Sequence, residues 1–515
     1  MKKKSTLSVL RKTFGTGKEY LLLSILFLHF SAYAQLNNAN WFFGDHSGFN
    51  FASTTAPAPT SIPTALYTGA ACASYSLSTG QFVFYTNGEE VYNANGTPMA
   101  NGSGLLGYNA LTQGAIIIKK PLSTNVYIIT LDGKMDGTFG QSQGLRYTEV
   151  KVVESVPAAS VLPSVKNIPL RDHTGVLLDE NYNLRCEKIT SAPHCNGRDY
   201  WLVTQVGAYI YSYLVNPSGI SPTPVTISPA LVNIQSTTGV QLYEPSAGQI
   251  KISPLNNRIA VAYYANATAQ LYTGSVAMGN FNSGNGSVSF DGNLIQVAPT
   301  FTPYPQVTFI QSLEFSPNGR YIYLGFYDEL YVGSSFGSTS ANIQLVNPIN
   351  TMPSPAPRMG CLQRAINGKI YVTSYNYPNT PLYSMSVINT PNSISAPNFQ
   401  VNIITPAYGS PGTGLPGWVH TQTGQNTCLG SISTAHEQAS LNIYPNPAKN
   451  YITLSVQDTV IKHIAITSIE GIEVFRADTN DYEVKIDVSN FRKGIYIATV
   501  VTENGDIVTN KIMIE

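Results

Sequence analysis

Three pairs of adjacent acidic residues are the first candidates for chemistry in this sequence. Glu89-Glu90, Asp179-Glu180 and Asp328-Glu329 could supply the paired carboxylates of a glycosidase or a lyase. Consecutive residues on a strand point to opposite faces, so none of these pairs forms a dyad by itself. We therefore interpret them as solvated loop charges and predict no catalytic residue.

Two glycine motifs have the spacing of known active-site loops. The segment GSGLLG (102–107) matches a dinucleotide-binding fingerprint, and GSSFG (333–337) matches the loop that presents a nucleophilic serine, here Ser335. Both motifs require a helix directly afterwards, whereas a turn and a strand are expected after each. We interpret both as chance matches in glycine-rich loops.

The histidines and cysteines do not form a metal-binding pattern. His436-Glu437 is followed by Gln-Ala-Ser, so the HExxH zinc motif is absent. The sequence contains no CxxC motif. Four other histidines are scattered singly: His46, His173, His194 and His420. No metal or cofactor is expected.

The number of cysteines is odd, so at least one lies outside any intramolecular pair: Cys72, Cys186, Cys195, Cys361 and Cys428. Cys186 and Cys195 are close in sequence, but an extended strand would separate them by about 30 Å. A disulfide needs Cα atoms within about 7 Å. We reject this pair unless Pro193 folds the strand back.

Composition excludes several classes of protein. Charged residues make up 11% of the 515 residues and the formal net charge is zero, whereas Gly (42), Pro (32) and Tyr (32) are abundant. A basic nucleic-acid-binding surface and a disordered polyelectrolyte are therefore not indicated. Short strands joined by turns fit this composition.

Residues 1–34 have the pattern of a secretory signal peptide. Lysines and arginines precede the apolar run LLLSILFLHF (21–30), and small residues lead to a cleavage site between Ala34 and Gln35. The apolar run is shorter than the ~20 residues of a comfortable membrane span, which argues against an anchor. No membrane span is expected in the mature chain.

A turn followed by an apolar, aromatic strand recurs through the middle of the chain. The turn positions lie 45 to 72 residues apart: Gly80, Asn125, Gly197, Asn257, Gly319 and Gly368. Asn-Gly steps supply the positive φ angles of tight hairpins. A sandwich has no such long period, whereas a propeller repeats a four-stranded blade.

We therefore predict an all-β chain whose residues 35–425 form a β-propeller of seven blades, or six. Stacked blades must close into a ring, so the two ends of this region have to meet. Trp41 and Trp418 lie at its borders. We expect them to belong to closing strands or to anchor the core there.

The order of several motifs resembles a known family. NWFFGDHSGFNF (40–51), TQGAIIIKKP (112–121), LEFSPNGRYIYL (313–324) and GLPGWVH (414–420) resemble secreted Bacteroidetes proteins with a WD40-like or YVTN-like β-propeller. The resemblance covers nearly all of residues 36–425. It implies a cell-surface setting and supplies no catalytic residues.

The composition changes near residue 440. Charged residues rise from about 8% over 36–439 to about 22% over 440–515, after a polar stretch. We predict a linker at 426–440 and a small antiparallel β-sandwich at 441–515. In Val484-Lys485-Ile486-Asp487-Val488, apolar and charged residues alternate as in a strand with one buried face.

The sandwich opens with the step Tyr444-Pro445-Asn446-Pro447. Its two prolines lack backbone N–H groups and exclude it from a central strand. Taken alone it reads as a rigid, extended lead-in, with Asn446 suited to a turn. However, an ordered set of residues resembles the type A C-terminal sorting domain of the type IX secretion system: Tyr444, Pro445, Asn446, Pro447, Gly471, Gly494, Tyr496 and Lys511. The resemblance implies passage through the periplasm to the outer surface. It also implies removal of the domain on arrival, often with attachment to lipopolysaccharide.

These observations favour a secreted or cell-surface binding protein of adhesin-like type. The expected partners are the type IX machinery and surface glycans, lipopolysaccharide or other surface proteins, and no nucleic acid. The alternative is an enzyme that acts on extracellular polysaccharide or peptide at the mouth of the propeller channel, because loops from several blades converge there. Carboxylates and histidines meeting at one mouth would favour the enzyme.

Overall fold

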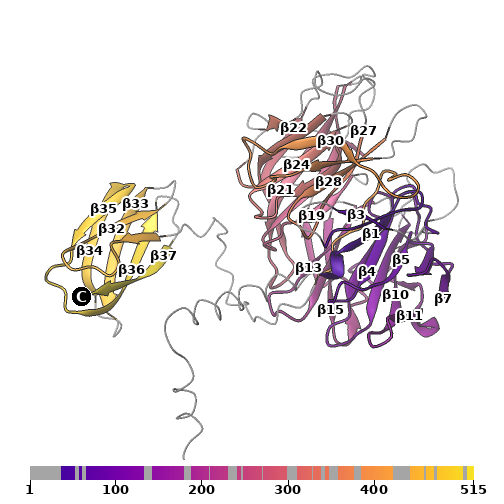
Figure 1. The fold of residues 1–515 in the computed structure, drawn as a ribbon, viewed down its shortest axis with the longest axis horizontal. Coiled ribbons are helices and arrows are strands. Elements are labelled where there is room, and N and C mark those ends of the chain that lie inside the picture. Colours follow the sequence, from indigo (N-terminus) through magenta and orange to yellow (C-terminus); the bar gives the residue numbers. More distant parts are fainter. Residues whose placement is uncertain are drawn as a thin grey trace, which may run out of the picture. The chain divides into compact units, whose positions relative to one another are not determined.

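The computed structural model describes residues 36–52, 57–60, 65–132, 142–178, 187–207, 209–229, 241–244, 248–268, 271–297, 310–326, 329–337, 343–346, 358–375, 384–420, 441–456, 460–468, 473–502 and 507–515. The chain divides into two compact units, Met1–Leu429 and Gly430–Glu515 (Figure 1). Each unit consists of antiparallel sheets.

The described part of the first unit forms seven successive sheets. The first has three strands, β1 (Asn40–Phe43), β2 (Ser47–Asn50) and β3 (Ala58–Pro59). The next three are β4 (Ala73–Ser76), β5 (Phe82–Thr86), β6 (Glu90–Asn93) and β7 (Pro98–Ser103); β8 (Ala115–Lys119), β9 (Val126–Asp132), β10 (Gly144–Val153), β11 (Ala158–Val161) and β12 (Ile168–Pro169); and β13 (Ile189–Pro193), β14 (Tyr200–Val206), β15 (Tyr209–Asn216), β16 (Gly219–Ile220) and β17 (Thr226–Pro229).

The last three sheets of this unit are β18 (Gln241–Glu244), β19 (Ile250–Ile252), β20 (Arg258–Thr268), β21 (Leu271–Phe281) and β22 (Val288–Val297); β23 (Ile310–Phe315), β24 (Tyr321–Phe326), β25 (Glu329–Ser334) and β26 (Gln344–Leu345); and β27 (Arg358–Arg364), β28 (Ile370–Tyr375), β29 (Met385–Ile388) and β30 (Phe399–Ile404). Two short 3₁₀ turns accompany them, η3 (Leu36–Asn38) and η4 (Pro163–Val165).

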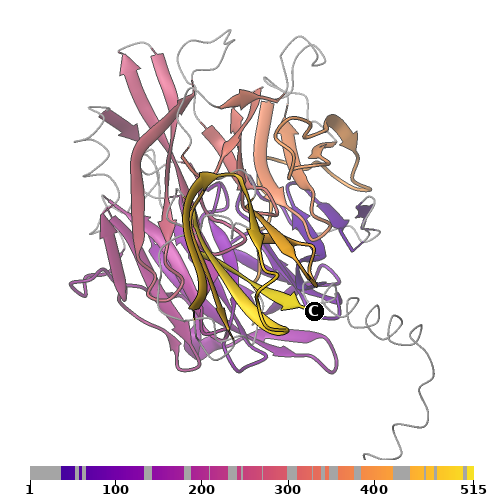
Figure 2. The ribbon, with the colours of Figure 1, turned by 90° about the vertical axis from the view of Figure 1, so that its left-hand side faces the viewer.

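The edge strands of successive sheets contact one another in sequence order. Contacts run from β1 to β4, β8, β13, β19, β23 and β27, so each sheet places its first strands toward a common centre. Figure 2 shows the sheets following one another around that centre, from indigo to orange. This arrangement confirms the predicted propeller-like all-β fold. The seven described sheets favour seven blades, and the number of blades stays a prediction.

Five of the six predicted turns join the first and second strands of a four- or five-stranded sheet, and the turn at Asn257 joins β19 to β20, the second and third strands of its sheet. Gly80, Gly197, Gly319 and Gly368 have positive φ angles of 84°, 68°, 72° and 75°. In the other two turns the prediction is off by one or three positions, because Leu122 and Asn256 adopt the positive φ instead of Asn125 and Asn257. The three-stranded sheet lies outside the predicted set of turns, although Gly44 between β1 and β2 also has a positive φ of 63°.

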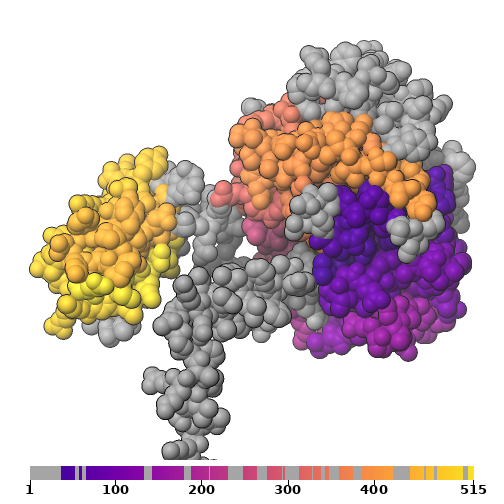
Figure 3. All heavy atoms as spheres, in the orientation of Figure 1, coloured from indigo at the N-terminus to yellow at the C-terminus, as the bar shows by residue number. Residues whose placement is uncertain are grey.

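Both ends of the first unit's sequence meet. The ring of Trp41 in β1 packs edge-on against Tyr371 of β28, with centroids 6.1 Å apart. The guanidinium carbon of Arg364 lies over the ring of Trp418, 4.6 Å from the ring centroid. The indigo and orange parts of this unit accordingly form one continuous surface (Figure 3). The prediction that both tryptophans belong to the closure is confirmed.

Residues 410–419 run alongside residues 38–45 in the opposite direction. Asp45 and Ser410 exchange backbone hydrogen bonds, and the backbone N–H of Val419 donates to Asn38 Oδ1 at 2.7 Å. Leu415 and Val419 are buried in this segment. Residues 410–419 therefore pack against the N-terminal segment and the turn between β1 and β2.

The second unit is a β-sandwich, as predicted. One sheet contains β31 (Leu441–Tyr444), β32 (Tyr451–Val456) and β35 (Glu483–Asp487); the other contains β33 (Ile461–Ser468), β34 (Glu473–Asp481), β36 (Gly494–Thr502) and β37 (Ile507–Ile514). Its core joins apolar residues of both sheets, among them Ile452, Leu454, Ile464, Ile466, Ile486, Val500 and Ile512. Lys485 and Asp487 are exposed between buried or half-buried neighbours, which confirms the predicted alternation.

Candidate functional site

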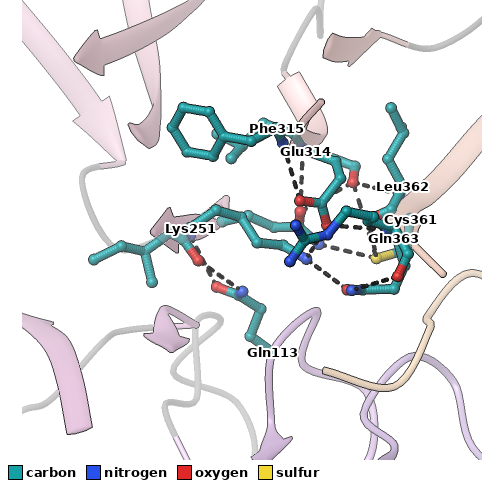
Figure 4. A network of polar contacts seen from close by, with 12 residues as sticks. Gln113, Lys251, Glu314, Phe315, Cys361, Leu362 and Gln363 are labelled. Atoms are coloured by element: carbon teal, nitrogen blue, oxygen red, sulfur yellow. Dashed lines mark hydrogen bonds and ion pairs between the residues drawn. The ribbon is translucent and has the colours of Figure 1, made fainter. Parts of the chain in front are cut away.

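Polar side chains from three central strands converge in the first unit, but they neutralise one another. Lys251 Nζ of β19 donates to Glu314 Oε2 of β23 at 3.0 Å and to Gln363 Oε1 of β27 at 2.6 Å (Figure 4). The side chains of Lys251 and Glu314 are only 12% and 5% exposed. Glu314 is thus a structural carboxylate that joins two sheets, rather than one half of an open acid pair.

A second bridge links more distant sheets. The side-chain amide of Gln113, just before β8, donates to the Ile250 carbonyl at 3.0 Å and accepts from the Ile250 N–H at 2.9 Å. The neighbouring Gln249 contacts β27, where its Nε2 lies 3.2 Å from Cys361 Sγ. Buried polar groups that are satisfied in this way specify how the sheets fit together.

An open pocket lies instead at the edge of the sheets β4–β7 and β8–β12. Its volume is about 600 Å³. It is lined by Glu89, Glu90, Gly104, Leu105, Leu106, Gly107, Tyr108, Asp132 and Gln143. Three of these residues are carboxylates, two from the β5–β6 hairpin and one from the end of β9. We take this pocket as the candidate functional site.

The turn between β5 and β6 holds two of the carboxylates. Asn87 Oδ1 accepts from the N–H groups of Glu89 and Glu90 at 3.0 and 2.9 Å, which closes the turn. Gly88, in the same turn, has φ 90°. A Cβ on Gly107 would lie 2.6 Å from the carbonyl oxygen of Gly88, so the opposite wall needs a glycine as well.

Hydrogen bonds hold each carboxylate in place. Glu89 accepts from the N–H and the side-chain amide of Asn109 at 3.1 and 3.3 Å, and Glu90 accepts from the Gly104 N–H at 3.3 Å. Asp132 Oδ2 accepts from the Gln143 N–H at 2.7 Å. An ionised carboxylate has about four acceptor positions. Glu89 and Glu90 can therefore accept further hydrogen bonds from a ligand in the pocket.

The pocket is electrically negative. The pKa of nearby Tyr92 is raised, first by burial and then by the charges of Glu90 and Glu89. The negative potential itself follows from the lining, since the described residues around the pocket include three carboxylates and no lysine or arginine. Such a site suits an uncharged or cationic ligand better than an anionic one.

Two of the acidic pairs were misjudged from the sequence. Glu89 and Glu90 are half-buried and hydrogen-bonded, and Glu329 is fully buried and accepts from the Tyr331 hydroxyl at 2.6 Å, so they are not solvated loop charges. Glu89 and Glu90 meet partners 20 and 14 residues away, which a local pattern does not contain, whereas the burial of Glu329 depends on how its sheet packs. Asp179-Glu180 and Asp328 lie outside the described residues.

The two glycine motifs are structural, as expected. Ser335 is 1% exposed and its hydroxyl donates to the Gly319 carbonyl at 2.6 Å, so it is no exposed nucleophile. Residues 104–107 of GSGLLG line the pocket and lead to β8, not to a helix. Their part in the pocket had no sequence signal, because it depends on the neighbouring sheet.

The four single histidines of the first unit have separate surroundings. His46 contacts Asp45, and His173 Nδ1 lies 2.8 Å from the Tyr211 hydroxyl. His194 stacks on Trp201, and His420 Nε2 lies 2.8 Å from the Ser191 carbonyl oxygen. The described residues contain no group of three or more metal-ligating side chains. His436-Glu437 lies outside them.

Two cysteines are free and buried, Cys72 and Cys361. The pKa of Cys72 is raised, mainly by burial and also by Cys361. Cys195 is disulfide-bonded. Cys186 and Cys428 lie outside the described residues, so the rejection of a Cys186–Cys195 bridge stays a prediction.

In the second unit, the residues predicted as a sorting signal come together from both ends of the module. Asn446 Nδ2 donates to the Lys511 carbonyl at 2.7 Å, and the Met513 N–H donates to Asn446 Oδ1 at 2.8 Å. Tyr444 donates to Glu483 Oε2 at 2.8 Å. The opening step is thus fastened to the last strand, β37.

The backbone around this step corrects one expectation. Residues 445–450 connect the antiparallel strands β31 and β32, so the step is a turn and not an extended lead-in. Both X-Pro bonds, before Pro445 and before Pro447, are cis. Gly494 begins β36, and the Tyr496 hydroxyl donates to the Arg492 carbonyl at 2.8 Å. Gly471, Ala34 and Gln35 lie outside the described residues.

Comparison with known proteins identifies the second unit. Residues 442–515 match the family model described as a secretion system C-terminal sorting domain. Two curated enzymes are similar to parts of the chain. An ulvan lyase of Nonlabens ulvanivorans is 29% identical over 77 residues, 15% of this chain and 14% of the enzyme. A beta-agarase of Zobellia galactanivorans is 24% identical over 213 residues, 38% of this chain and 40% of the enzyme.

Solved structures also align with the chain. A protein of unknown function from Bacteroides caccae is 10% identical, with 75% of this chain and 98% of that chain covered and a TM-score of 0.29. A puromycin hydrolase is 11% identical, with 77% and 51% covered and a TM-score of 0.32. Similarities this distant carry no functional argument.

No helix among the described residues is long and apolar enough to cross a membrane. The sorting domain directs export by the type IX secretion system, so the protein's destination is the cell surface or the exterior.

Proposed function

We propose that the protein is a polysaccharide-binding protein of the cell surface, with its ligand site in the pocket at Glu89 and Glu90. The observation that carries this proposal is the open, negatively charged pocket of about 600 Å³. Carboxylates held by backbone and amide donors accept hydrogen bonds from sugar hydroxyls. The negative potential favours neutral polysaccharides over sulfated or uronic-acid-rich ones.

The partial similarities support the ligand class. Both curated relatives carry the names of polysaccharide-degrading enzymes, and this chain is exported to the compartment where such polymers occur. The matches span 14% and 40% of those enzymes, so their activities do not transfer to this chain. They direct the choice of polymers to test.

Affinity electrophoresis tests the binding proposal. The signal-free chain migrates through native gels that contain agarose, laminarin, xylan or ulvan. We expect retardation by at least one of the three neutral polymers and not by the anionic ulvan. Glu89→Gln and Glu90→Gln together should weaken this retardation without unfolding the protein. Free migration in all four gels would contradict the proposed function.

A second candidate is an enzyme that cleaves such a polymer, because Asp132 lines the same pocket as Glu89 and Glu90. Hydrolysis of such a polymer adds water across a glycosidic bond and would release reducing ends. Product formation that Asp132→Asn abolishes would establish the enzyme. Retardation in the gels without product would leave the binding protein.

We also propose the finer organisation. The first unit is a WD40-like or YVTN-like propeller at 35–425, followed by a linker at 426–440 and the sorting domain at 441–515. The sorting domain is removed on arrival, and the mature protein is attached to lipopolysaccharide.

Deletion of 441–515 should leave a protease-resistant propeller in the periplasm of a type IX-competent host. Fusion of 441–515 to an exported fluorescent protein should bring that reporter to the surface. Normal surface delivery of the truncated chain would contradict the assignment.

A further inference from the structure

Two exposed tyrosines differ from the other tyrosines of the first unit. Most described tyrosines there are core residues, and ten of them are buried: Tyr75, Tyr85, Tyr127, Tyr200, Tyr211, Tyr213, Tyr263, Tyr323, Tyr331 and Tyr371. Among the described residues, the exposed ones are Tyr67, Tyr209 and Tyr408, at 67%, 40% and 43%. Tyr67 and Tyr408 lie on chain segments that flank the same residue, Asp45.

The backbone places these segments side by side. Asp45 forms antiparallel bridges with Tyr67 on one side and with Ser410 on the other. The hydroxyl of Ser47 donates to the Tyr408 carbonyl at 3.2 Å. Adjacent strands lie about 4.8 Å apart, so the outer two segments are roughly 10 Å apart across Asp45. Several linked sugar rings can span this distance.

The side chains suit a sugar chain. A tyrosine ring offers an apolar face for the C–H groups of a sugar and a hydroxyl at its edge, and it loses little conformational entropy on binding. Asp45 and His46, whose side chains are about half exposed, lie between the two tyrosines. The Asp45 carboxylate can accept hydrogen bonds from sugar hydroxyls, and it repels anionic polymers.

This surface adjoins the pocket. Asn87 Nδ2 donates to the Tyr67 carbonyl at 3.1 Å, and Asn87 Oδ1 accepts from the N–H groups of Glu89 and Glu90. Asn109, which binds Glu89, also accepts a hydrogen bond from Thr68 through its backbone carbonyl. Asn87 and Asn109 therefore both connect the tyrosine segment to the pocket wall.

We propose that Tyr67 and Tyr408, on either side of Asp45, form a stacking platform for a neutral polysaccharide chain whose end or branch enters the pocket at Glu89. The proposal rests on the proposed function and specifies its ligand as uncharged. The platform exists only in the closed ring, because Tyr67 and Tyr408 come from opposite ends of the unit's sequence.

Tyrosine variants of the signal-free full chain test the platform in the same four gels. Tyr67→Ala and Tyr408→Ala should each weaken retardation by a neutral polymer about tenfold, and Tyr67→Phe should keep most of it, because the ring remains. Tyr209→Ala is the matched control, since it removes a similarly exposed tyrosine from β15 and should have no effect. Unchanged thermal midpoints would show that all variants are folded.

The outcomes separate the two proposals. Retardation of the parent chain that survives Tyr67→Ala with Tyr408→Ala would overturn the platform and leave the binding function intact. Equal loss with Tyr209→Ala would also overturn it. No retardation of the parent by agarose, laminarin or xylan would overturn both.

Discussion

Asp45 and Ser410 exchange two backbone hydrogen bonds, of 2.9 and 2.8 Å, although they lie at opposite ends of the first unit's sequence. This pairing brings the C-terminal segment onto the first sheet. It explains why the unit can close although its first sheet has only three strands of its own. It also places the proposed tyrosine platform.

The closing segment should contribute strongly to stability. A chain that ends after Ile404 loses the buried Leu415 and Val419 and the Asp45–Ser410 pair, whereas one that ends after His420 keeps them. We expect the shorter chain to be less stable by the order of 5 kcal/mol, from lost burial and hydrogen bonds. Urea unfolding and limited proteolysis measure the difference. Equal stability would show that the segment is dispensable.

A point variant tests the same contact. Gly409 has φ +64°, and a Cβ there would lie 1.7 Å from the Asp45 carbonyl oxygen. Gly368 has φ +75° with nothing within 4 Å, so Gly368→Ala carries only the backbone penalty of about 1 kcal/mol. Gly409→Ala should cost clearly more in the same urea unfolding.

Breaking the buried Lys251–Glu314 ion pair should lower the free energy of unfolding. Lys251→Met removes the cation that donates to Glu314 in a nearly solvent-free position and leaves Arg364 as a nearby charge, so we expect a loss of about 3 kcal/mol. Adding Glu314→Leu removes the stranded charge and should recover a large part of that loss. Guanidinium unfolding of the single and double variants gives the coupling. An additive double variant would show that the pair does not interact.

Stability should fall with acid because of His420. Its pKa is lowered from 6.5 to about 4, first by burial and then by the nearby Arg364, against the raising effect of the Ser191 carbonyl. Between these two pH values the unfolded chain binds a proton that the folded chain does not, so stability is lost as pH falls through this range, by about 2–3 kcal/mol.

The matched variant for this effect is His420→Gln, whose amide can still donate to Ser191. The difference in unfolding free energy between the parent and His420→Gln should shift in favour of the variant from pH 7 to pH 4. Comparison within this pair cancels the contribution of His194, whose pKa is also lowered by burial. A difference that does not change with pH would contradict the lowered pKa of His420.

Export should depend on Asn446. Asn446→Ala removes both hydrogen bonds to the last strand, which should destabilise the sorting domain by about 1 kcal/mol and reduce the surface-delivered fraction of the full chain. Asn442→Ala changes an exposed asparagine of β31 and serves as the control. Immunodetection on intact type IX-competent cells measures delivery. Equal delivery of the two variants would separate this contact from sorting.

Local patterns predicted the elements whose causes are local. The turns at Gly80, Gly197, Gly319 and Gly368 were found because a positive φ favours glycine wherever the chain reverses. The alternation around Ile486 was found because one face of its strand is buried. Asn125 and Asn257 were misplaced because neighbouring residues can adopt the same backbone conformation.

The sequence by itself thus determined the all-β class, the succession of hairpins and the export module, since each depends on residues that are close together in the chain. The tertiary structure alone decided which acidic residues are exposed, because Glu89 meets Asn109 only after the strands pair and Glu329 is buried only after the sheets pack. It also decided the ring closure at Asp45 and Ser410 and the pocket beside it. Contacts between distant segments depend on how the sheets pack against one another, and no local spacing of residues records that packing.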